Sequence, residues 1–408
     1  MKRVVITGMA GITSLGDDWD SIARAVLERR TGIRYMSEWD VYTNMNTRLG
    51  GPVPDFVPPP HFTRKNTRSM GRVALLATVA AERSLQDAGL REHPVLKSGR
   101  TGVAFGSCTG STDAVRDFGS MLTNHDTRGI NANSYIRMMA HTAPVNMALY
   151  FGLRGRVLPT SSACTSGSMG IGQAYETIQA GRQSLMLAGG AEELCPSEAA
   201  VFDTLFATST RNEVPHLTPR PYDRARDGLV IGEGAGCLIL EELQHALERG
   251  AHIHAEIVGY GSNSDGAHVT QPEAETMGVA MQLALDDAAL PASAIGYVNG
   301  HGTATEHGDI AETQAAHKVL GRKPISSLKG YFGHTLGACG AVEAWLTIEM
   351  LNRDWYIPTA NLSHVDERCG DLDYLQDEPR RMQHEYVMTN NFAFGGINTS
   401  LIFKRWRA

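Results

Sequence analysis

The sequence contains little cysteine and no excess of positive charge. Six of its 408 residues are cysteine, and none of the six forms a Cys-x-x-Cys pair. Their spacing fits neither a zinc site nor a disulfide framework, so we expect a reducing, cytoplasmic environment. Lys and Arg total 37 against 44 Asp and Glu, which gives a formal net charge of −7. This balance argues against a general nucleic-acid binder.

Long apolar runs are also missing. Stretches such as 74–81 are far shorter than the ~20 residues that cross a membrane, so no membrane span is expected. The basic start, Met1-Lys2-Arg3, precedes an apolar segment that Gly8 and Gly11 interrupt. No small-residue cleavage site follows a long apolar stretch, so the segment predicts a buried strand and a turn rather than a signal peptide.

Glycine is what the sequence has in excess. The chain has 43 glycines, more than a tenth of its residues, whereas about 7% is typical. They follow no collagen period and therefore mark tight turns and close approaches of the backbone. With 42% hydrophobic and 20% charged residues, the remaining composition is that of an ordinary globular protein.

Short apolar segments alternate with helical periodicity along the whole chain. Strands are predicted at 4–7, 102–105, 184–188, 253–258, 295–298, 325–328 and 386–390, with a strand pair within 228–240. Helices are predicted at 19–29, capped by Asp17 or Asp18, and at 69–87, 244–249, 277–288 and 340–351. This alternation indicates α/β layers, and residues 49–62 predict an irregular excursion. No low-complexity linker separates the two halves, which we expect to pack as one unit.

One cysteine lies in an unusual setting. Cys164 follows a short apolar stretch, is surrounded by Ala, Ser, Thr and Gly, and precedes a segment of helical character at 171–179. A helix N-terminus favours a thiolate, and small neighbours leave room for a substrate. For a cysteine considered alone, however, an unreactive buried position in a tight turn is the more common outcome.

Two histidines stand next to glycines. His301 lies between two glycines directly after a predicted strand, where the backbone can come close to a ligand, and His334 follows Gly333. Considered alone, each also fits a loop histidine bonded to backbone. His301 and His307 match no zinc-protease motif, so no metal site is expected. One cysteine together with two such histidines indicates nucleophilic thioester chemistry.

Two further features accompany the histidines. Lys329 and Glu343 lie on either side of His334, and such a pair either is structural or tunes a histidine. Near the C-terminus, Phe392 and Phe394 precede the pair Gly395-Gly396. An ordinary turn between strands would also produce this pattern.

In this order and at these separations, the segments resemble the β-ketoacyl-[acyl carrier protein] synthases, in particular the elongating synthase I/II group of the thiolase superfamily. The resemblance covers essentially the whole chain. It extends to the segments Thr7-Gly-Met-Ala-Gly11, Leu187-Ala-Gly-Gly-Ala-Glu192, Pro221-Tyr-Asp-Arg-Ala-Arg-Asp-Gly228 and Gly232-Glu-Gly-Ala-Gly236. It implies an α/β, thiolase-like five-layered αβαβα fold of two similar halves. Residues 1–250 would carry the nucleophile, and residues 251–408 the two histidines and a gating loop.

The resemblance also implies a reaction, a decarboxylative Claisen condensation catalysed by an acyltransferase. Cys164 would accept an acyl group, and His301 and His334 would donate hydrogen bonds to the carbonyl of a malonyl thioester as it loses carbon dioxide. Lys329, paired with Glu343, would fix the charge and orientation of the site. Both substrates would be carried on the phosphopantetheine of an acyl carrier protein, with no metal and no other cofactor.

Further positions match family positions with known roles. The resemblance implies an oxyanion hole from the backbone of Cys164 and Phe394, and a gate formed by Phe392, Phe394, Gly395 and Gly396. It implies that Thr303, Thr305 and Thr270 bind pantetheine and that Thr109 and Phe202 belong to the acyl pocket. It also implies that the carrier protein docks on Arg64, Lys65, Arg68, Arg72 and Phe206.

The sequence departs from the family pattern at four of these places. Ala393 and Ile397 stand in the gate where Gly and Thr are usual, and Thr109 stands where synthase II often has a bulky aliphatic residue. Phe206 replaces an Arg that often contacts the carrier protein. The small polar Thr109 suggests an unsaturated or functionalised acyl chain. Fatty-acid synthesis and a specialised polyketide or polyene pathway therefore both stay open.

Two other functions deserve comparison. A non-catalytic chain-length-type partner subunit would lack the cysteine, whereas Cys164 is present with both histidines. In a dinucleotide-binding oxidoreductase, the strand at 4–7 would lead into a Gly-x-Gly-x-x-Gly turn, but Gly8, Gly11 and Gly16 do not have that spacing. By resemblance a homodimer is expected, and a heterodimer with a related ketosynthase subunit stays open.

Overall fold

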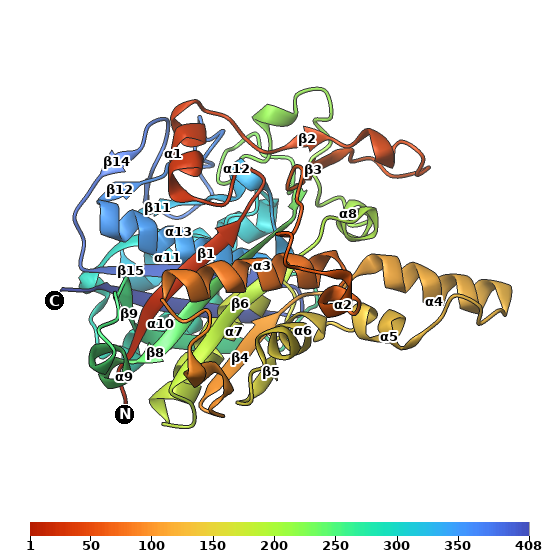
Figure 1. Cartoon of the computed structure of the whole chain (residues 1–408). Helices are drawn as coiled ribbons and strands as arrows, with labels where there is room; N and C mark the ends of the chain where they lie inside the picture. The colour runs from red at the N-terminus through yellow and green to blue at the C-terminus, as the bar shows by residue number, and fades with distance from the viewer. Residues whose placement is uncertain (408) are drawn as a thin grey trace.

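The computed structural model describes residues 1–407. Its main feature is a mixed sheet of eleven strands (Figure 1). From one edge to the other, the strands are β13 (Asp373–Tyr374), β11 (Pro324–Ser326), β10 (Ile295–Asn299), β15 (Tyr386–Ala393), β16 (Ile397–Arg405), β9 (Ala255–Ser264), β1 (Val4–Ile12), β8 (Gly234–Glu242), β6 (Leu185–Glu192), β4 (Thr101–Gly106) and β5 (Val157–Pro159).

The sheet consists of two halves with the same strand order. In the first half the order is β5-β4-β6-β8-β1, and in the second it is β11-β10-β15-β16-β9. In each half the first three strands are parallel, and the next two pairings are antiparallel. The halves join where β1 and β9 pair through three residues each. This repeat confirms the two similar halves implied by the sequence.

Helices separate and cover the halves to give five layers. α7 (Ser166–Gln179) and α13 (Cys339–Arg353) pack on each other and contact strands of both halves. α3 (Arg72–Asp87) and α6 (Thr142–Phe151) cover the outer face of the first half, and α10 (Ala274–Asp287) and α11 (Glu306–Leu320) lie over the second. The largest apolar cluster surrounds α7 and α13. The predicted αβαβα fold is therefore confirmed.

Shorter elements surround this framework. The remaining helices are α1 (Trp19–Leu27), α2 (Arg64–Thr67), α4 (Thr112–Asn124), α5 (Ala132–Met138), α8 (Pro196–Asp203), α9 (Leu243–Glu248) and α12 (Lys329–Phe332). One small sheet contains β2 (Arg34–Tyr35), β3 (Leu49–Gly51) and β7 (Ile231–Gly232). A second small sheet pairs β12 (Trp355–Tyr356) with β14 (Arg380–Arg381). α4 and α5 project from the body, at the right of Figure 1. Across residues 1–407 we find no helix with the length and apolar character needed to cross a bilayer.

Most predicted elements are present, with differences at their ends. Asp18 caps α1, and its carboxylate accepts a hydrogen bond from the Ser21 N–H at 2.8 Å. Of the two predicted caps, Asp17 and Asp18, the second is therefore the one present. The predicted strand pair within 228–240 is wrong. β7 pairs with β3 in a small sheet, and β8 pairs with β1 and β6 in the main sheet. The sequence shows two extended segments but not their different partners, which come from distant parts of the chain.

Candidate active site

Cys164 lies in the turn between β5 and α7, and its thiol is buried. Ala163, immediately before it, has a φ of 52°, a left-handed conformation that a residue other than glycine rarely adopts. α7 begins at Ser166 with Thr165 as its N-cap, so the cysteine stands just ahead of a helix N-terminus, as predicted. The backbone N–H groups of Cys164 and Phe394 lie near the thiol, where they lower its pKa and favour its charged form.

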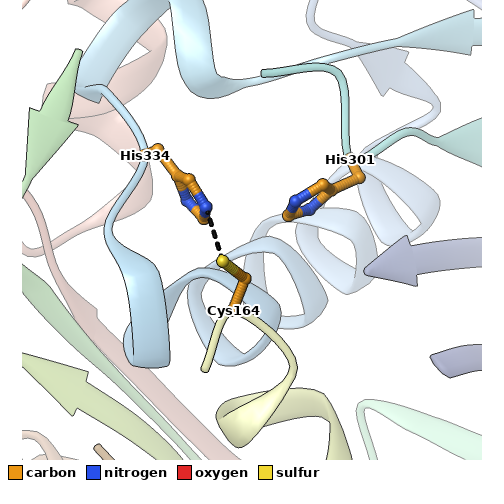
Figure 2. Close-up of side chains that lie close together, drawn as sticks. All are labelled: Cys164, His301 and His334. Carbon is orange, nitrogen blue, oxygen red and sulfur yellow. Dashed lines mark hydrogen bonds between the residues drawn. The ribbon is translucent and has the colours of Figure 1, made fainter. Parts of the chain in front are cut away.

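His334 brings a ring nitrogen to this thiol. Its Nε2 atom lies 3.0 Å from Sγ of Cys164 (Figure 2). The backbone N–H of His334 donates to the carbonyl of Val230 at 2.7 Å, which fixes the segment after α12. On the other side of the ring, the N–H of Leu336 donates to Nδ1 at 3.3 Å. Because Nδ1 accepts, the neutral ring carries its proton on Nε2, the atom that faces the thiol.

His301 completes the group from a third segment of the chain. Its ring is nearly perpendicular to that of His334, with 5.1 Å between the ring centroids, and both rings point toward Cys164 in Figure 2. The side-chain amide of Asn391 donates to Nδ1 of His301 at 3.4 Å, so here too Nε2 carries the proton. The structure thus brings together the three residues that the sequence singled out.

A buried ion pair lies next to His301. Lys329 and Glu343 form a salt bridge in which both side chains are almost completely buried. The second carboxylate oxygen of Glu343 accepts a hydrogen bond from Asn391 at 2.7 Å, and the same amide contacts His301. A chain of contacts therefore runs from Lys329 through Glu343 and Asn391 to the imidazole. Asn391 was not assigned a role from the sequence, although it adjoins the aromatic pair of the predicted gate.

Burial keeps the cysteine and both histidines neutral. It raises the pKa of the Cys164 thiol to about 12, against smaller opposing effects of Lys329 and of the two backbone N–H groups. It lowers the pKa of His301 and of His334 well below the usual range, and the positive charge of Lys329 lowers both pKa values further. The position ahead of a helix N-terminus was expected to favour a thiolate, but burial opposes that effect and raises the pKa of the thiol more than the nearby groups lower it.

Two carboxylates hold the loop that carries His301, and the sequence analysis missed them. Glu312, on α11, accepts hydrogen bonds from the backbone N–H groups of His301 at 2.5 Å and Gly302 at 2.7 Å. Asp309, on the same helix, accepts from the next two N–H groups, at 3.0 and 3.1 Å. Burial raises the pKa of Glu312 to about 7 and that of Asp309 to about 6. Their spacing of three residues on one helix was a signal that the sequence did contain.

Two groups of side chains in this region have the donor types of a metal site. They are Cys164 with His301 and His334, and His301 with Cys339 and Glu343, each with its donor atoms within 4.8 Å of one another. The charges fit a cation poorly. Lys329 already supplies the positive charge that Glu343 pairs with, and the same charge lowers the pKa of both histidines.

Above this group the protein encloses a cavity of about 520 Å³. Its lining includes Cys164, His301 and His334. Of the predicted pantetheine, acyl-pocket and gate residues, the lining includes Thr270, Thr303, Thr305, Phe202, Phe392, Phe394 and Gly396. The hydroxyls of Thr303 and Thr305 lie 2.9 Å apart, so both face the same space.

The predicted gate is the turn between β15 and β16. Phe394, Gly395 and Gly396 form the turn, and both glycines have positive φ, 85° and 71°. The ring of Phe394 packs on Phe202 with 5.0 Å between centroids. The Gly395 N–H donates to the carbonyl of Val269 at 2.8 Å, which ties the turn to the opposite loop. Of the four predicted gate residues, Gly395 alone does not line the cavity.

Of the other predicted residues, only Phe206 lines the cavity. Thr109 is absent from the lining, and its hydroxyl donates to a carboxylate oxygen of Glu198 at 3.0 Å. Phe206 is 87% exposed and lies at the cavity mouth. Arg64, Lys65 and Arg68 are exposed on and next to α2, away from the lining.

Arg72 differs from the other members of the predicted basic cluster. Its guanidinium makes two hydrogen bonds to Glu233, at 2.7 and 2.8 Å. Its charge is therefore already paired within the fold.

Comparison with known proteins identifies the fold family. The model of the β-ketoacyl synthase N-terminal domain matches residues 1–246, and that of the C-terminal domain matches residues 254–363. The chain belongs to the β-ketoacyl synthase family. The 3-oxoacyl-[acyl-carrier-protein] synthase 2 of Vibrio harveyi is 38% identical over 412 residues, which cover 99% of each chain.

Solved ketosynthase structures superpose over the whole chain. A β-ketoacyl synthase from Burkholderia phymatum has a TM-score of 0.99 and 59% identity, with 100% of each chain covered. A ketosynthase in complex with its type II polyketide acyl-carrier protein, bound to a hexaketide, has a TM-score of 0.88 and 29% identity, again with full coverage of both chains. The predicted family is thus confirmed.

Proposed function

We propose that this β-ketoacyl synthase joins an acyl group held on Cys164 to a malonyl unit carried by an acyl carrier protein, releasing carbon dioxide and a 3-oxoacyl thioester. The observation that carries the proposal is the meeting of one thiol and two neutral imidazoles at the floor of a single cavity. That combination suits a thioester nucleophile next to donors for a developing enolate.

The first step transfers the acyl group. The Cys164 sulfur attacks the acyl thioester, the bond to the pantetheine sulfur breaks, and the proton of the cysteine thiol ends on the departing pantetheine sulfur. Negative charge develops on the carbonyl oxygen during the attack. The N–H groups of Cys164 and Phe394, which lie near the cysteine sulfur, are the donors placed to stabilise that oxygen.

The second step forms the new carbon–carbon bond. The malonyl thioester loses carbon dioxide, and the electron pair of the broken bond passes into an enolate. Nε2–H groups of His301 and His334 donate hydrogen bonds to the enolate oxygen, a role that requires neutral rings with the proton on Nε2. The enolate carbon then attacks the acyl group on Cys164 and frees the thiolate, which regains a proton.

The surrounding residues orient these groups. Lys329 and Glu343 hold Asn391, whose amide in turn fixes the tautomer of His301. Thr303, Thr305 and Thr270 line the cavity where a pantetheine arm would enter, and their hydroxyls suit its amides. In this proposal residues 1–250 supply the nucleophile, and residues 251–408 supply both histidines and the gate.

We infer that an acyl carrier protein is the partner that delivers both substrates, and that Arg64, Lys65 and Arg68 attract its acidic surface. The full-length likeness to a ketosynthase in complex with its carrier supports this partner. We also infer a homodimer, since α4, α5 and α6 expose the apolar side chains Val115, Leu122, Tyr135 and Leu149. A cytoplasmic location stays a prediction.

Acylation measured on the intact protein tests the proposed function. Incubation with acyl-carrier thioesters should add one acyl mass at Cys164, and added malonyl carrier should then release a 3-oxoacyl product. The variant Cys164→Gln should lose condensation but retain malonyl decarboxylation, because both histidines remain. Condensation by that variant would overturn the assignment. A wild-type chain that is never acylated would instead favour the non-catalytic partner subunit.

A further inference from the structure

Glu198 is a buried acid that the reaction does not use. It lies on α8 and is 5% exposed. One carboxyl oxygen accepts the hydroxyl of Thr109 at 3.0 Å, and the other, Oε2, has no hydrogen-bond partner among residues 1–407. A buried polar atom without a partner costs free energy that an apolar residue of similar size would avoid. Such an atom calls for an explanation in terms of function.

Two neighbouring acids, Glu192 and Glu193, differ from Glu198 in this respect. Glu192 accepts the Ser107 hydroxyl at 2.7 Å and the Cys108 N–H at 2.6 Å. Glu193 accepts hydrogen bonds from Ser111 and Thr112 at 2.7–2.9 Å. Both oxygens of each neighbour are therefore bonded within the fold. Their role is structural, whereas Glu198 keeps a free oxygen.

The position of Glu198 connects it to the nucleophile. Phe202, one helical turn further along α8, lines the cavity together with Cys164. Cys108 packs against the apolar cluster that contains Cys164 and Phe202. Ionisation of Cys164 or Glu198 would raise the pKa of the Cys108 thiol, after the larger effects of burial and Glu192. Cys108 thus lies close to both the nucleophile and the acid.

The surroundings of the Glu198 carboxyl favour its neutral form. Burial, followed by the negative charge of Glu192, raises its pKa well above the usual range, and the charges of Cys195 and Glu193 act in the same direction. A neutral carboxylic acid has one O–H donor as well as acceptor oxygens. With Oε1 bonded to Thr109, the free half of the group can donate to, or accept from, a polar atom of a ligand.

We propose that Glu198 is a specificity-determining residue, and that it selects an acyl group carrying a hydroxyl or carbonyl substituent over a fully saturated chain of equal length. This inference rests on the proposed function, because it requires an acyl group on Cys164. The chain would run from Cys164 past Phe202 and Cys108, and its polar substituent would meet the free half of the Glu198 carboxyl. Thr109 positions that carboxyl.

Competition between matched acyl donors tests this assignment. The full-length protein is incubated with pantetheine thioesters of octanoic acid and of hydroxyoctanoic acids, with the hydroxyl at each chain carbon in turn. Acylation of Cys164 is followed by intact-protein mass spectrometry. At least one hydroxyoctanoyl donor should react about three- to tenfold faster than octanoyl, the difference that one hydrogen bond makes.

Variants locate the preference in the carboxyl group. Glu198→Leu should reverse the preference and raise the melting temperature, because it removes an unpaired buried acid. Glu198→Gln should retain most of the preference, and Thr109→Val should weaken it. Val201→Ala, on the exposed side of α8, is the matched control and should behave as the wild type.

Three results would count against the proposal. If the wild type and Glu198→Leu rank the donors identically, Glu198 does not select the acyl group. If Glu198→Leu changes only the oligomeric state, the free oxygen meets a second copy of the chain rather than substrate. If no donor acylates Cys164 in any variant, the proposed function fails first, which distinguishes the two failures.

Discussion

The floor and the mouth of the cavity are built in different ways. The floor, defined as Cys164, His301 and His334, is buried, and each of its side chains is fixed by contacts with backbone or with other buried groups. The mouth, which includes Phe206 and His268, is exposed and lies on loops. At the floor, burial sets the protonation states. At the mouth, water screens charges and few contacts restrain the side chains.

This difference separates chemistry from substrate entry. Groups that react must be held in one geometry and one protonation state, which the buried floor supplies. Groups that admit a carrier-bound substrate must allow movement, and the proposed gate at 394–396 has two glycines in positive φ. Changes at the floor should therefore alter rates greatly, and changes at the mouth should alter them little.

The largest expected effect is the loss of a floor histidine. His301→Ala or His334→Ala should lower condensation about a hundred- to ten-thousandfold, because a hydrogen-bond donor to the enolate disappears. Acylation of Cys164 should persist, as mass spectrometry of the intact protein would show. His268→Ala, at the mouth, is the control and should stay near wild-type rates. Equal losses in floor and mouth variants would break the comparison.

The pH dependence of alkylation should be nearly as large. Because burial raises the pKa of Cys164 to about 12, the thiolate fraction should rise about tenfold for each pH unit through the neutral range. The rate of iodoacetamide labelling at Cys164 should thus grow about a hundredfold from pH 7 to pH 9. A rate that levels off near neutral pH would show that the thiolate exists at rest.

A moderate effect is expected from the loop that carries His301. Glu312→Gln replaces one acceptor oxygen by an NH2 group, which cannot accept the hydrogen bond of the backbone N–H that faces it. The variant should lower the free energy of unfolding by about 1–3 kcal/mol. Denaturant unfolding measures this change. Glu306→Gln, on the same helix but exposed and paired with Arg368, is the control, with an expected loss of about 0–1 kcal/mol. Similar losses in both variants would argue against a special role for Glu312.

The smallest effect is expected at the exposed mouth. Phe206→Arg adds one positive charge to an exposed position and should lower the KM for an acidic acyl carrier protein by a few-fold, corresponding to about 1 kcal/mol at most. The kcat should not change, and added salt should remove the difference. Steady-state kinetics with carrier protein at low and high salt would check this. An unchanged KM for every carrier would exclude a docking role at this position.

The sequence predicted the fold and the floor better than their surroundings. Alternating strands and helices, the small residues around Cys164 and the glycines beside His301 and His334 are local signals, so they could be read along the chain. The pairing of Arg72 with Glu233 could not be read from the sequence, because the two residues are 161 positions apart. Asn391 and Glu312 were missed for a similar reason, since their roles depend on the loop that they contact.

By itself, the sequence determined the family and the doubled α/β architecture and singled out the three side chains of the floor, because each depends on residue type and local spacing. The tertiary structure decided their protonation states. A thiol ahead of a helix N-terminus suggests a thiolate, yet desolvation in the packed interior raises its pKa. The fold likewise decided which polar groups are paired, and so separated the bonded Glu192 from Glu198 with its free oxygen. Burial and pairing arise from distant segments that meet only when the chain folds.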